Sequence, residues 1–361
     1  MSPERQQWVN ALTGQQLGGY ILDGYLGGGG FGMVFAAHHA TTGAEVAVKV
    51  LDPSGANDAN TVADFDNEGV LLKKLVRRSH VINWHETSTA TVPVTLGVGA
   101  TVATVQLPFK YHVIARASGV LDEITSDPSL LNEMDWLERL SHWRGVILGV
   151  HQMHLSTVAH RDLKAENCLL MAGLKNSVEI RLTDLGRSKD FSTPPRYVVE
   201  EYLQGRGDKR HAAPECLLLL AGSTEADFRL ADLYGIGSVL AELATGQSMT
   251  ALALNWQDVI QQAMIDFRAG IQIDPGVLRP RYNRAFEEVA RHVPPVIQKE
   301  VTDLLGQLCD PVAADRLPKA FGRRPLKTDG LQWLLRRADI AHRRLEAHIK
   351  QKQMNGRKTA G

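Results

Sequence analysis

The first part of the chain alternates between short apolar runs and glycine-rich turns. Residues 20–51 show the pattern of a strand, a glycine turn, a second strand, a turn at Thr42–Gly43 and a third strand. Apolar residues then recur at helical spacing within residues 62–78, and Val/Thr-rich sequence at 91–117 again indicates strands. Residues 15–117 are therefore predicted to form a β-sheet region with one main helix.

From about residue 120 the apolar positions follow a helical period. Residues 131–156, 230–246 and 300–310 each carry apolar residues at the spacing of one helix face. We see no internal repeats. A sheet-rich region followed by a helix-rich region predicts an α+β fold, with the helical region spanning 118–325.

The two ends of the chain differ in character from this central region. Residues 1–14 are treated as an N-terminal extension. Residues 326–361 predict a basic amphipathic helix, and the last eleven residues are polar and are expected to be disordered. A basic amphipathic helix can contact a membrane surface or nucleic acid, but packing of its apolar stripe on its own domain is the more common arrangement. The stripe consists of Leu331, Leu334, Leu335, Leu345 and Ile349.

Composition narrows the class of protein. Lys plus Arg and Asp plus Glu both number 40, so the formal net charge is zero and no nucleic-acid partner is expected. The three cysteines are far apart and odd in number, which indicates reduced, mostly buried thiols. We recognise no signal peptide and no apolar stretch of the ~18 residues that a membrane span needs. A cytoplasmic location is therefore expected.

A glycine-rich turn links the first two predicted strands. Gly27, Gly29, Gly32 and Val34 fit the pattern G-x-G-x-x-G-x-V. Glycines let backbone N–H groups approach phosphate oxygens because no Cβ stands in the way. A dinucleotide-binding fingerprint must open a helix, and this turn joins two strands instead. A plain hairpin turn remains the alternative for this stretch taken alone.

Lys49 lies within the apolar strand VAVKVL. A lysine there loses hydration unless it meets an anion, and the available anions are a phosphate and Glu68 on the following helix. Gly69 follows Glu68 and costs a helix about 1 kcal/mol relative to alanine. A lysine that faces solvent from the strand is the alternative.

The stretch AHRDLKAENCLL crowds charged and polar residues into a few positions before an apolar run. HRDLKAEN matches H-R-D-x-x-x-x-N, and together with the glycine turn and the Lys49 strand it resembles the protein kinase family. The resemblance implies a bilobal fold, with an N-terminal antiparallel sheet lobe and a C-terminal mostly helical lobe. It also implies ATP as substrate and Mg²⁺ as cofactor, with Mn²⁺ as an alternative ion.

The resemblance continues in order along the chain. Asp184-Leu185-Gly186 is similar to the family's D-F-G, and Ala213-Pro214-Glu215 is similar to A-P-E. In such a kinase Asp232 would brace the catalytic loop, and Arg316 would pair with Glu215. These elements span residues 26–316, about four fifths of the chain.

The resemblance also assigns roles to residues of this sequence. Asp162 would accept the proton of the acceptor hydroxyl, and Lys164 would neutralise charge on the transferring phosphoryl group. Asn167 and Asp184 would hold the metal ion. The nucleotide would contact Leu26, Gly27, Gly28, Gly29, Gly30, Phe31, Gly32, Met33, Val34, Ala47, Lys49, Glu68, Ala115, Ala117 and Leu169.

The expected function is therefore transfer of the ATP γ-phosphate to protein substrates, with autophosphorylation. Lys164, two residues after Asp162, is typical of Ser/Thr kinases and favours those acceptors. Two other classes stay open: a pseudokinase that acts as a binding or scaffold module, and a kinase-like phosphotransferase for small molecules. The basic C-terminal helix is a candidate contact for a further partner.

The segment before A-P-E departs from the family pattern. Asp208 stands where threonine is usual, and His211 stands where tyrosine is usual. A carboxylate at 208 is expected to pair with Lys164 and to repel Asp162, which predicts unusual recognition of the acceptor. Candidate phosphorylation sites in this region are Ser188, Ser192, Thr193 and Tyr197, and Arg161 is a candidate partner for such a phosphate.

Overall fold

The computed structural model describes residues 1–30, 32–98, 101–173, 177–194, 203, 207–271, 273–317 and 330–359. The chain divides into two compact units. Unit 1 comprises residues 1–118 together with Asp184–Arg187, and unit 2 comprises residues 119–183 and 188–361.

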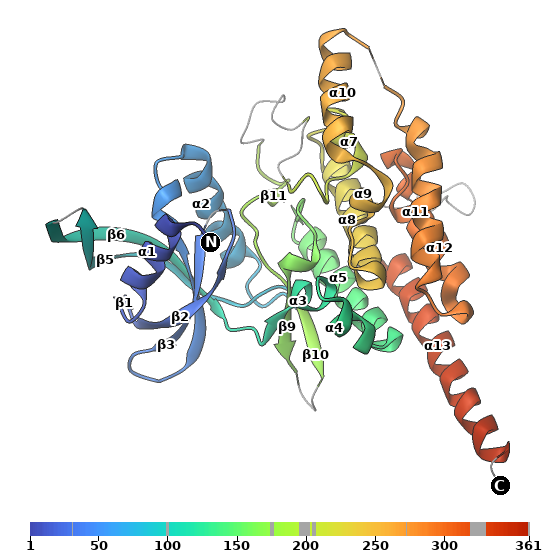
Figure 1. Ribbon diagram of the computed structural model, residues 1–361, viewed down its shortest axis with the longest axis horizontal. Coiled ribbons are helices and arrows are strands. Elements are labelled where there is room, and N and C mark those ends of the chain that lie inside the picture. The colour runs from blue at the N-terminus through green and yellow to red at the C-terminus, as the bar shows by residue number, and fades with distance from the viewer. Residues whose placement is uncertain are drawn as a thin grey trace. The chain divides into compact units, whose positions relative to one another are not determined.

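Unit 1 is built on a six-stranded antiparallel sheet with the strand order β1-β2-β3-β4-β6-β5 (Figure 1). The predicted N-terminal antiparallel sheet is confirmed. A core of buried side chains, including Leu22, Phe35, Val48 and Val113, lies against this sheet. The elements are α1 (Pro3–Leu12), β1 (Gln16–Leu17), β2 (Tyr20–Gly28), β3 (Gly32–His39), β4 (Glu45–Leu51), the 3₁₀-helix η1 (Pro53–Gly55), α2 (Ala59–Lys74), β5 (Trp84–Val98) and β6 (Thr101–Ala115).

Helix α2 packs closely against the sheet. Asp58 caps its N-terminus by accepting the N–H groups of Asn60 and Thr61. A Cβ on Gly69 would lie 2.8 Å from His112 Cε1 and 3.0 Å from Thr87. Gly69, which weakens the helix locally, is therefore required by the close approach of α2 to β5 and β6.

Unit 2 is mostly helical, as predicted, and centres on α8. This helix starts in a capping box between Thr224 and Asp227 and ends at Gly246 in a left-handed conformation. The fully buried Trp143 of α5 donates from its indole nitrogen to the Ile236 carbonyl of α8 at 2.9 Å. The buried apolar surfaces of α5 and α8 thus form a packed core that supports the loops of unit 2.

The remaining elements of unit 2 follow in chain order. Two small antiparallel sheets, β10-β9-β7 and β11-β8, accompany the helices. The elements are β7 (Gly119–Val120), α3 (Leu121–Thr125), α4 (Pro128–Glu133), α5 (Trp136–Leu155), β8 (Val158–Ala159), η2 (Ala165–Asn167), β9 (Cys168–Ala172), β10 (Val178–Leu182), β11 (Lys189–Asp190), α7 (Pro214–Leu217), α8 (Glu225–Thr245), α9 (Met249–Ala253), α10 (Trp256–Arg268), η4 (Pro275–Leu278), α11 (Arg279–Arg291), α12 (Pro295–Leu308), η5 (Ala313–Arg316) and α13 (Gln332–Thr359).

The C-terminal helix α13 packs on α5 and α12 of the same chain. Leu334 and Leu345 are buried, and Arg337 bonds to Glu300 of α12 at 2.8 Å. The helix continues to residue 359, so the prediction that residues 351–361 are disordered is wrong for residues 351–359. Those residues, although polar, are mostly ones that a helix tolerates well.

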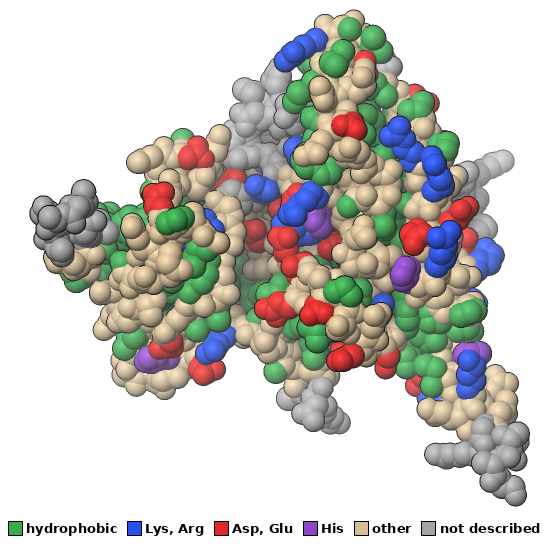
Figure 2. All heavy atoms as spheres, viewed as in Figure 1, with side chains coloured by type: hydrophobic (Ala, Val, Ile, Leu, Met, Phe, Trp, Pro, Cys, Tyr) green, Lys and Arg blue, Asp and Glu red, His purple; other side chains and the backbone are tan. Residues whose placement is uncertain are grey.

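The charged side chains are mixed in sign (Figure 2) and the cysteines are unpaired, as the composition predicts. On the visible face of unit 2, Lys and Arg side chains lie among Asp and Glu side chains (Figure 2). The cysteines are unpaired, with Cys168 and Cys309 buried and Cys216 half-buried. None of the helices in the described ranges is long and apolar enough to cross a membrane.

Candidate active site

The glycine-rich turn between β2 and β3 closes tightly. Gly29 N–H donates to the Gly32 carbonyl at 3.1 Å. A Cβ on Gly28 would lie 2.7 Å from the Gly32 carbonyl oxygen, and a Cβ on Gly32 would lie 2.7 Å from that of Val50. Backbone atoms cannot yield easily, so these two positions require glycine. The predicted contact Phe31 lies outside the described residues.

The other predicted nucleotide contacts from β2 to β4 differ in exposure. Leu26 is exposed and Val34 is half-buried. Ala47 and Met33 are buried, and the Met33 side chain belongs to the core of the sheet. Any contact that Met33 makes with a ligand therefore involves its main chain.

Lys49 forms an ion cluster inside unit 1. Its Nζ donates to Glu68 Oε2 at 2.6 Å and to Asp184 Oδ1 at 2.9 Å. The Glu68 side chain is 1% exposed and that of Lys49 is 10% exposed. The solvent-facing alternative for Lys49 is therefore wrong, and the expected contact with Glu68 is present. Asp184 is a second carboxylate partner.

Burial and charge act in opposite directions on the pKa values of Lys49 and Glu68. Burial alone would lower the pKa of Lys49, but Asp184 and Glu68 together hold it above its ordinary value. Burial raises the pKa of Glu68, against the opposing effect of Lys49. The Asp184 segment is secured because Asn67 Nδ2 donates to the Gly186 carbonyl at 2.8 Å.

Two of the predicted nucleotide contacts, Ala115 and Ala117, lie at the end of β6 and just beyond it. Ile114 is buried, and Ala115 pairs with Val46 across the strands. Ala115 N–H donates to the Asn83 carbonyl at 2.9 Å, so the main-chain donor of Ala115 is already used within unit 1. Ala117 follows the strand and is half-buried. Leu169, in β9 of unit 2, is also half-buried and pairs with Arg181 and Val120.

A buried carboxylate organises the HRDLKAEN loop of unit 2. Asp232 Oδ1 accepts the N–H of Arg161 at 2.7 Å, and Oδ2 accepts the N–H of His160 at 2.9 Å. His154 Nε2 lies 2.8 Å from the same Oδ2. Burial would raise the pKa of Asp232, but the hydrogen bonds from His154 and the backbone lower it overall. Arg161 has φ +68°, and these bonds hold that left-handed conformation.

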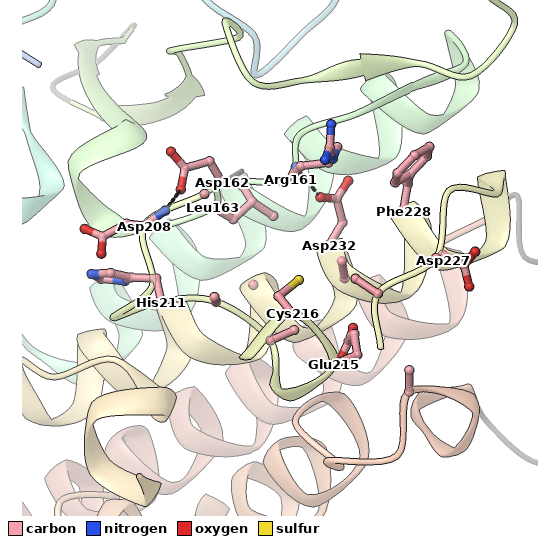
Figure 3. Close-up of a pocket in the computed structure, with 18 of the residues that line it drawn as sticks. Arg161, Asp162, Leu163, Asp208, His211, Glu215, Cys216, Asp227, Phe228 and Asp232 are labelled. Atoms are coloured by element: carbon pink, nitrogen blue, oxygen red, sulfur yellow. Dashed lines mark hydrogen bonds between the residues drawn. The ribbon is translucent and has the colours of Figure 1, made fainter. Parts of the chain in front are cut away.

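Asp162 is oriented by the backbone of the segment before A-P-E. Its Oδ1 accepts the N–H of Asp208 at 2.9 Å, as the dashed line in Figure 3 marks. Its own carbonyl accepts from Asn167 Nδ2 at 2.7 Å. The contact that Asp208 makes with Asp162 Oδ1 thus comes from its backbone N–H and not from its carboxylate.

Lys164 lies among acidic groups of unit 2. Its Nζ is 2.5 Å from Glu166 Oε2 and 3.7 Å from Asp208 Oδ2, so the expected Lys164–Asp208 ion pair is present. Burial would lower the pKa of Lys164, but these carboxylates raise it overall. Asp208 Oδ2 also lies 2.7 Å from Arg210 Nη2. Burial would raise the pKa of Asp208, but the hydrogen bonds from Arg210 hold this pKa well below its usual range.

A small cavity of about 100 Å³ lies beside this loop within unit 2. Figure 3 shows Arg161, Asp162, Asp208, His211 and Cys216 around it. Ligand pockets are typically about 300–1,000 Å³ in volume. The cavity is therefore too small to hold a nucleotide by itself.

The predicted metal ligands supply oxygen donors. The amide nitrogen of Asn167 is used by the Asp162 carbonyl, which leaves the amide oxygen for a metal ion. Asp184 supplies a carboxylate that is 27% exposed. Such hard oxygen donors fit Mg²⁺. In the described part of the chain, no cluster of three or more His, Cys, Asp or Glu side chains could hold a metal ion.

Two further predicted features belong to unit 2. Arg316 pairs with Glu215 through both carboxylate oxygens, at 2.7 and 2.6 Å.

Among the candidate phosphorylation sites, Ser188 is buried and donates to the His160 carbonyl, and Thr193 Oγ1 accepts from Lys189 Nζ at 3.0 Å. Tyr197 lies outside the described residues.

Comparisons with known proteins identify the family of this chain. The chain matches the protein kinase domain model over residues 20–320, and it belongs to that family. It is 28% identical over 228 residues to the G-type lectin S-receptor-like serine/threonine-protein kinase SD1-1 of Arabidopsis thaliana. It is 26% identical over 231 residues to the serine/threonine-protein kinase SIK3 homolog of Danio rerio. These matches cover 58% and 64% of this chain, but only 25% and 17% of the two relatives.

Proposed function

We propose that this chain is a protein kinase that transfers the γ-phosphate of Mg-ATP to Ser or Thr hydroxyls of proteins, itself included. The observation that carries the proposal is the buried Lys49, which is paired with Glu68 and Asp184. A lysine held between two carboxylates keeps its charge and its position, as binding of phosphate oxygens requires. Unit 1 would bind the nucleotide through this cluster and the glycine-rich turn.

Unit 2 would supply the groups that act on the acceptor. Asp162, fixed by the Asp208 N–H, would accept the hydroxyl proton and orient the oxygen for in-line attack. Lys164 would stabilise negative charge on the phosphoryl group. Asn167 and Asp184 would hold Mg²⁺, which neutralises charge on the phosphates when bound.

Two observations favour Ser/Thr acceptors. Lys164 stands two residues after Asp162, as in Ser/Thr kinases. Both relatives named above are serine/threonine-protein kinases. The acceptor class of this chain is proposed on that basis.

A scaffold function without catalysis is the second candidate. It is favoured by the replacements at 208 and 211, where the family's usual threonine and tyrosine are Asp208 and His211. A scaffold without catalysis would be expected to lack one or more of the catalytic and metal-binding residues, but the chain retains Lys49, Asp162, Asn167 and Asp184.

The test is incubation of the purified protein with Mg-ATP that carries a labelled γ-phosphate, beside the variants Asp162→Asn and Lys49→Met. Binding of ATP and the circular dichroism spectrum are measured for each protein. Label on wild-type protein alone supports the proposal, and its location on Ser, Thr or Tyr identifies the acceptor class. ATP binding without transfer to this chain or to a panel of protein and small-molecule acceptors would favour the scaffold. Absence of ATP binding by the folded wild-type protein would refute both the kinase and the nucleotide site.

A further inference from the structure

Helix α1 is part of the body of unit 1, although it precedes the residues matched by the kinase family. Ser2 caps the helix by accepting Arg5 N–H at 3.2 Å. Val9 and Leu12 are buried in the core of the sheet, and the Trp8 ring meets Phe109 edge-on with 6.1 Å between centroids. Apolar contacts therefore hold α1 in place.

Arg5 lies on the same face of α1 as these apolar residues, because positions 5, 8, 9 and 12 repeat at helical spacing. Its Nε donates to Asp52 Oδ2 at 2.7 Å. Its Nη2 donates to the Gly29 carbonyl at 3.1 Å. One guanidinium thus connects the end of β4 with the glycine-rich turn.

Asp52 is a rigid partner for Arg5. Its side chain is 5% exposed, and Oδ1 accepts Ser54 N–H at 2.9 Å at the start of η1. Burial would raise the pKa of Asp52, but the bonds from Ser54 and Arg5 lower it overall. The Arg5–Asp52 pair is therefore charged at neutral pH and is fixed from both ends.

The glycine-rich turn is the part of unit 1 that most needs such a restraint. Gly27, Gly28, Gly29 and Gly30 follow one another, and glycine loses more conformational entropy on ordering than any other residue. A bond from a fixed arginine to Gly29 lowers the entropy that a ligand must remove when it binds the turn. Restraint of this kind increases affinity without adding a contact to the ligand.

We infer that Arg5 is a positioning residue that clamps the glycine-rich turn to the end of β4 and thereby strengthens binding of ATP. This inference rests on the proposed function for its ligand. The clamp itself is a property of unit 1 and can be measured without nucleotide.

A simpler role for Arg5 would be to anchor α1 to the sheet. The buried Val9 and Leu12 already do so, and a substitution at position 5 leaves them in place. The two roles differ in a measurable way. A clamp affects the amides of the turn alone, whereas an anchor affects the amides of α1 as well.

The experiment compares Arg5→Gln, Arg5→Lys and Asp52→Asn with the wild type. Gln6→Ala is the matched control, since Gln6 is an exposed neighbour on the same helix whose side chain bonds to Asn10. Three quantities are measured: hydrogen–deuterium exchange of the nucleotide-free protein, the Kd for Mg-ATP by calorimetry, and KM and kcat for phosphate transfer.

We expect Arg5→Gln to speed exchange at residues 27–30 while residues 6–12 exchange as in the wild type. Its Kd and KM for ATP should rise about three- to tenfold, which corresponds to the net contribution of one ordinary hydrogen bond, with kcat within about twofold. Arg5→Lys should give an intermediate Kd, because one ammonium cannot reproduce the two-sided contact of a guanidinium. Asp52→Asn keeps a capping side chain and should resemble Arg5→Lys.

Unchanged exchange at residues 27–30 in Arg5→Gln would overturn the clamp. Faster exchange in α1 and the turn together would assign Arg5 to anchoring and would also overturn it. Faster exchange at the turn with an unchanged Kd would overturn the effect on ATP. If the wild-type protein binds no ATP, the proposed function fails, and the exchange data alone decide whether Arg5 restrains the turn.

Discussion

His211 Nδ1 lies 3.5 Å from Glu242 Oε1 in unit 2. Both atoms are buried, and neither has a hydrogen-bond partner within the described ranges. Glu242 Oε2 accepts the N–H of Ala165 at 3.1 Å, so the pair adjoins the loop that contains Lys164. The imidazole stands where the family usually has a tyrosine, and a proton on it would be shared with a buried carboxylate.

The His211–Glu242 pair predicts a dependence of stability on pH. Burial would lower the pKa of His211, but Glu242, aided by Asp208 and opposed by Lys164, raises it above the usual 6.5. A raised pKa in the folded state means that this stabilisation is complete below pH 6.5 and is lost as the pH rises through the folded-state pKa. The unfolding free energy of wild type minus His211→Gln should therefore fall from pH 5.5 to pH 8.5, measured by urea denaturation.

The same substitution in a Glu242→Gln background is the control for this pH effect. A glutamine at 242 retains an acceptor for Ala165 N–H but does not attract a proton on His211. The pH dependence of the difference should then disappear. A difference between wild type and His211→Gln that does not change with pH would contradict the prediction.

A second prediction concerns the backbone that orients Asp162. A Cβ on Gly207 would lie 2.8 Å from Asp162 Oδ1 and 3.0 Å from the Arg161 carbonyl oxygen. Gly207→Ala should displace the Asp162 carboxylate and reduce kcat about 10- to 100-fold. The Kd for ATP should change little, because Lys49 and the glycine-rich turn, which would bind the nucleotide, belong to unit 1 and are not altered. Steady-state phosphate transfer and calorimetry provide the two measurements.

Asp208→Thr is the matched substitution at the next position. It keeps the N–H that Asp162 accepts and restores the residue usual in the family. Phosphate transfer should stay within about threefold of the wild type, because the backbone contact that orients Asp162 is kept. If Asp208→Thr loses as much activity as Gly207→Ala, the Asp208 carboxylate itself is needed for transfer.

The buried Glu215–Arg316 pair predicts a large effect on the stability of the fold. The Arg316 side chain is completely buried and its guanidinium binds both oxygens of Glu215. Glu215→Gln leaves a buried charge without its counter-ion and should lower the unfolding free energy by about 3–5 kcal/mol. Urea denaturation followed by circular dichroism measures this loss.

An exposed ion pair is the control for the stability measurement. Arg291 and Glu288 lie three residues apart on α11 with side chains 71% and 44% exposed. Glu288→Gln should change the unfolding free energy by less than about 0.5 kcal/mol. Equal small effects at residues 215 and 288 would mean that the buried pair stabilises the fold no more than a surface pair.

Features carried by short motifs could be predicted from the sequence. The glycine turn joins two strands, Lys49 meets Glu68, and Asp232 and Arg316 make the contacts that the family pattern implies. Each of these depends on a residue type that has few alternatives at its position. A buried lysine needs an anion, and a buried carboxylate needs donors.

Features that depend on tertiary contacts were missed or only partly predicted. The low helix propensity of Gly69 does not reveal its close contact with His112, because that contact forms only when α2 packs on the folded sheet. The short apolar set of α1 gave too weak a signal to place Val9 and Leu12 in the core, and Arg5 meets Asp52 across 47 positions of sequence. Burial of Ser188, one of the candidate phosphorylation sites, likewise had no local signal.

Because Asp184–Arg187 belong to unit 1, this unit is not encoded by one continuous stretch of the gene. A gene fragment that ends at residue 118 encodes the whole sheet but lacks one carboxylate partner of Lys49 and the carbonyl acceptors of Asn67. Such a fragment would expose an unfinished polar surface to solvent. An independently expressed unit 1 therefore needs residues 184–187 supplied, either as an added peptide or grafted through a linker.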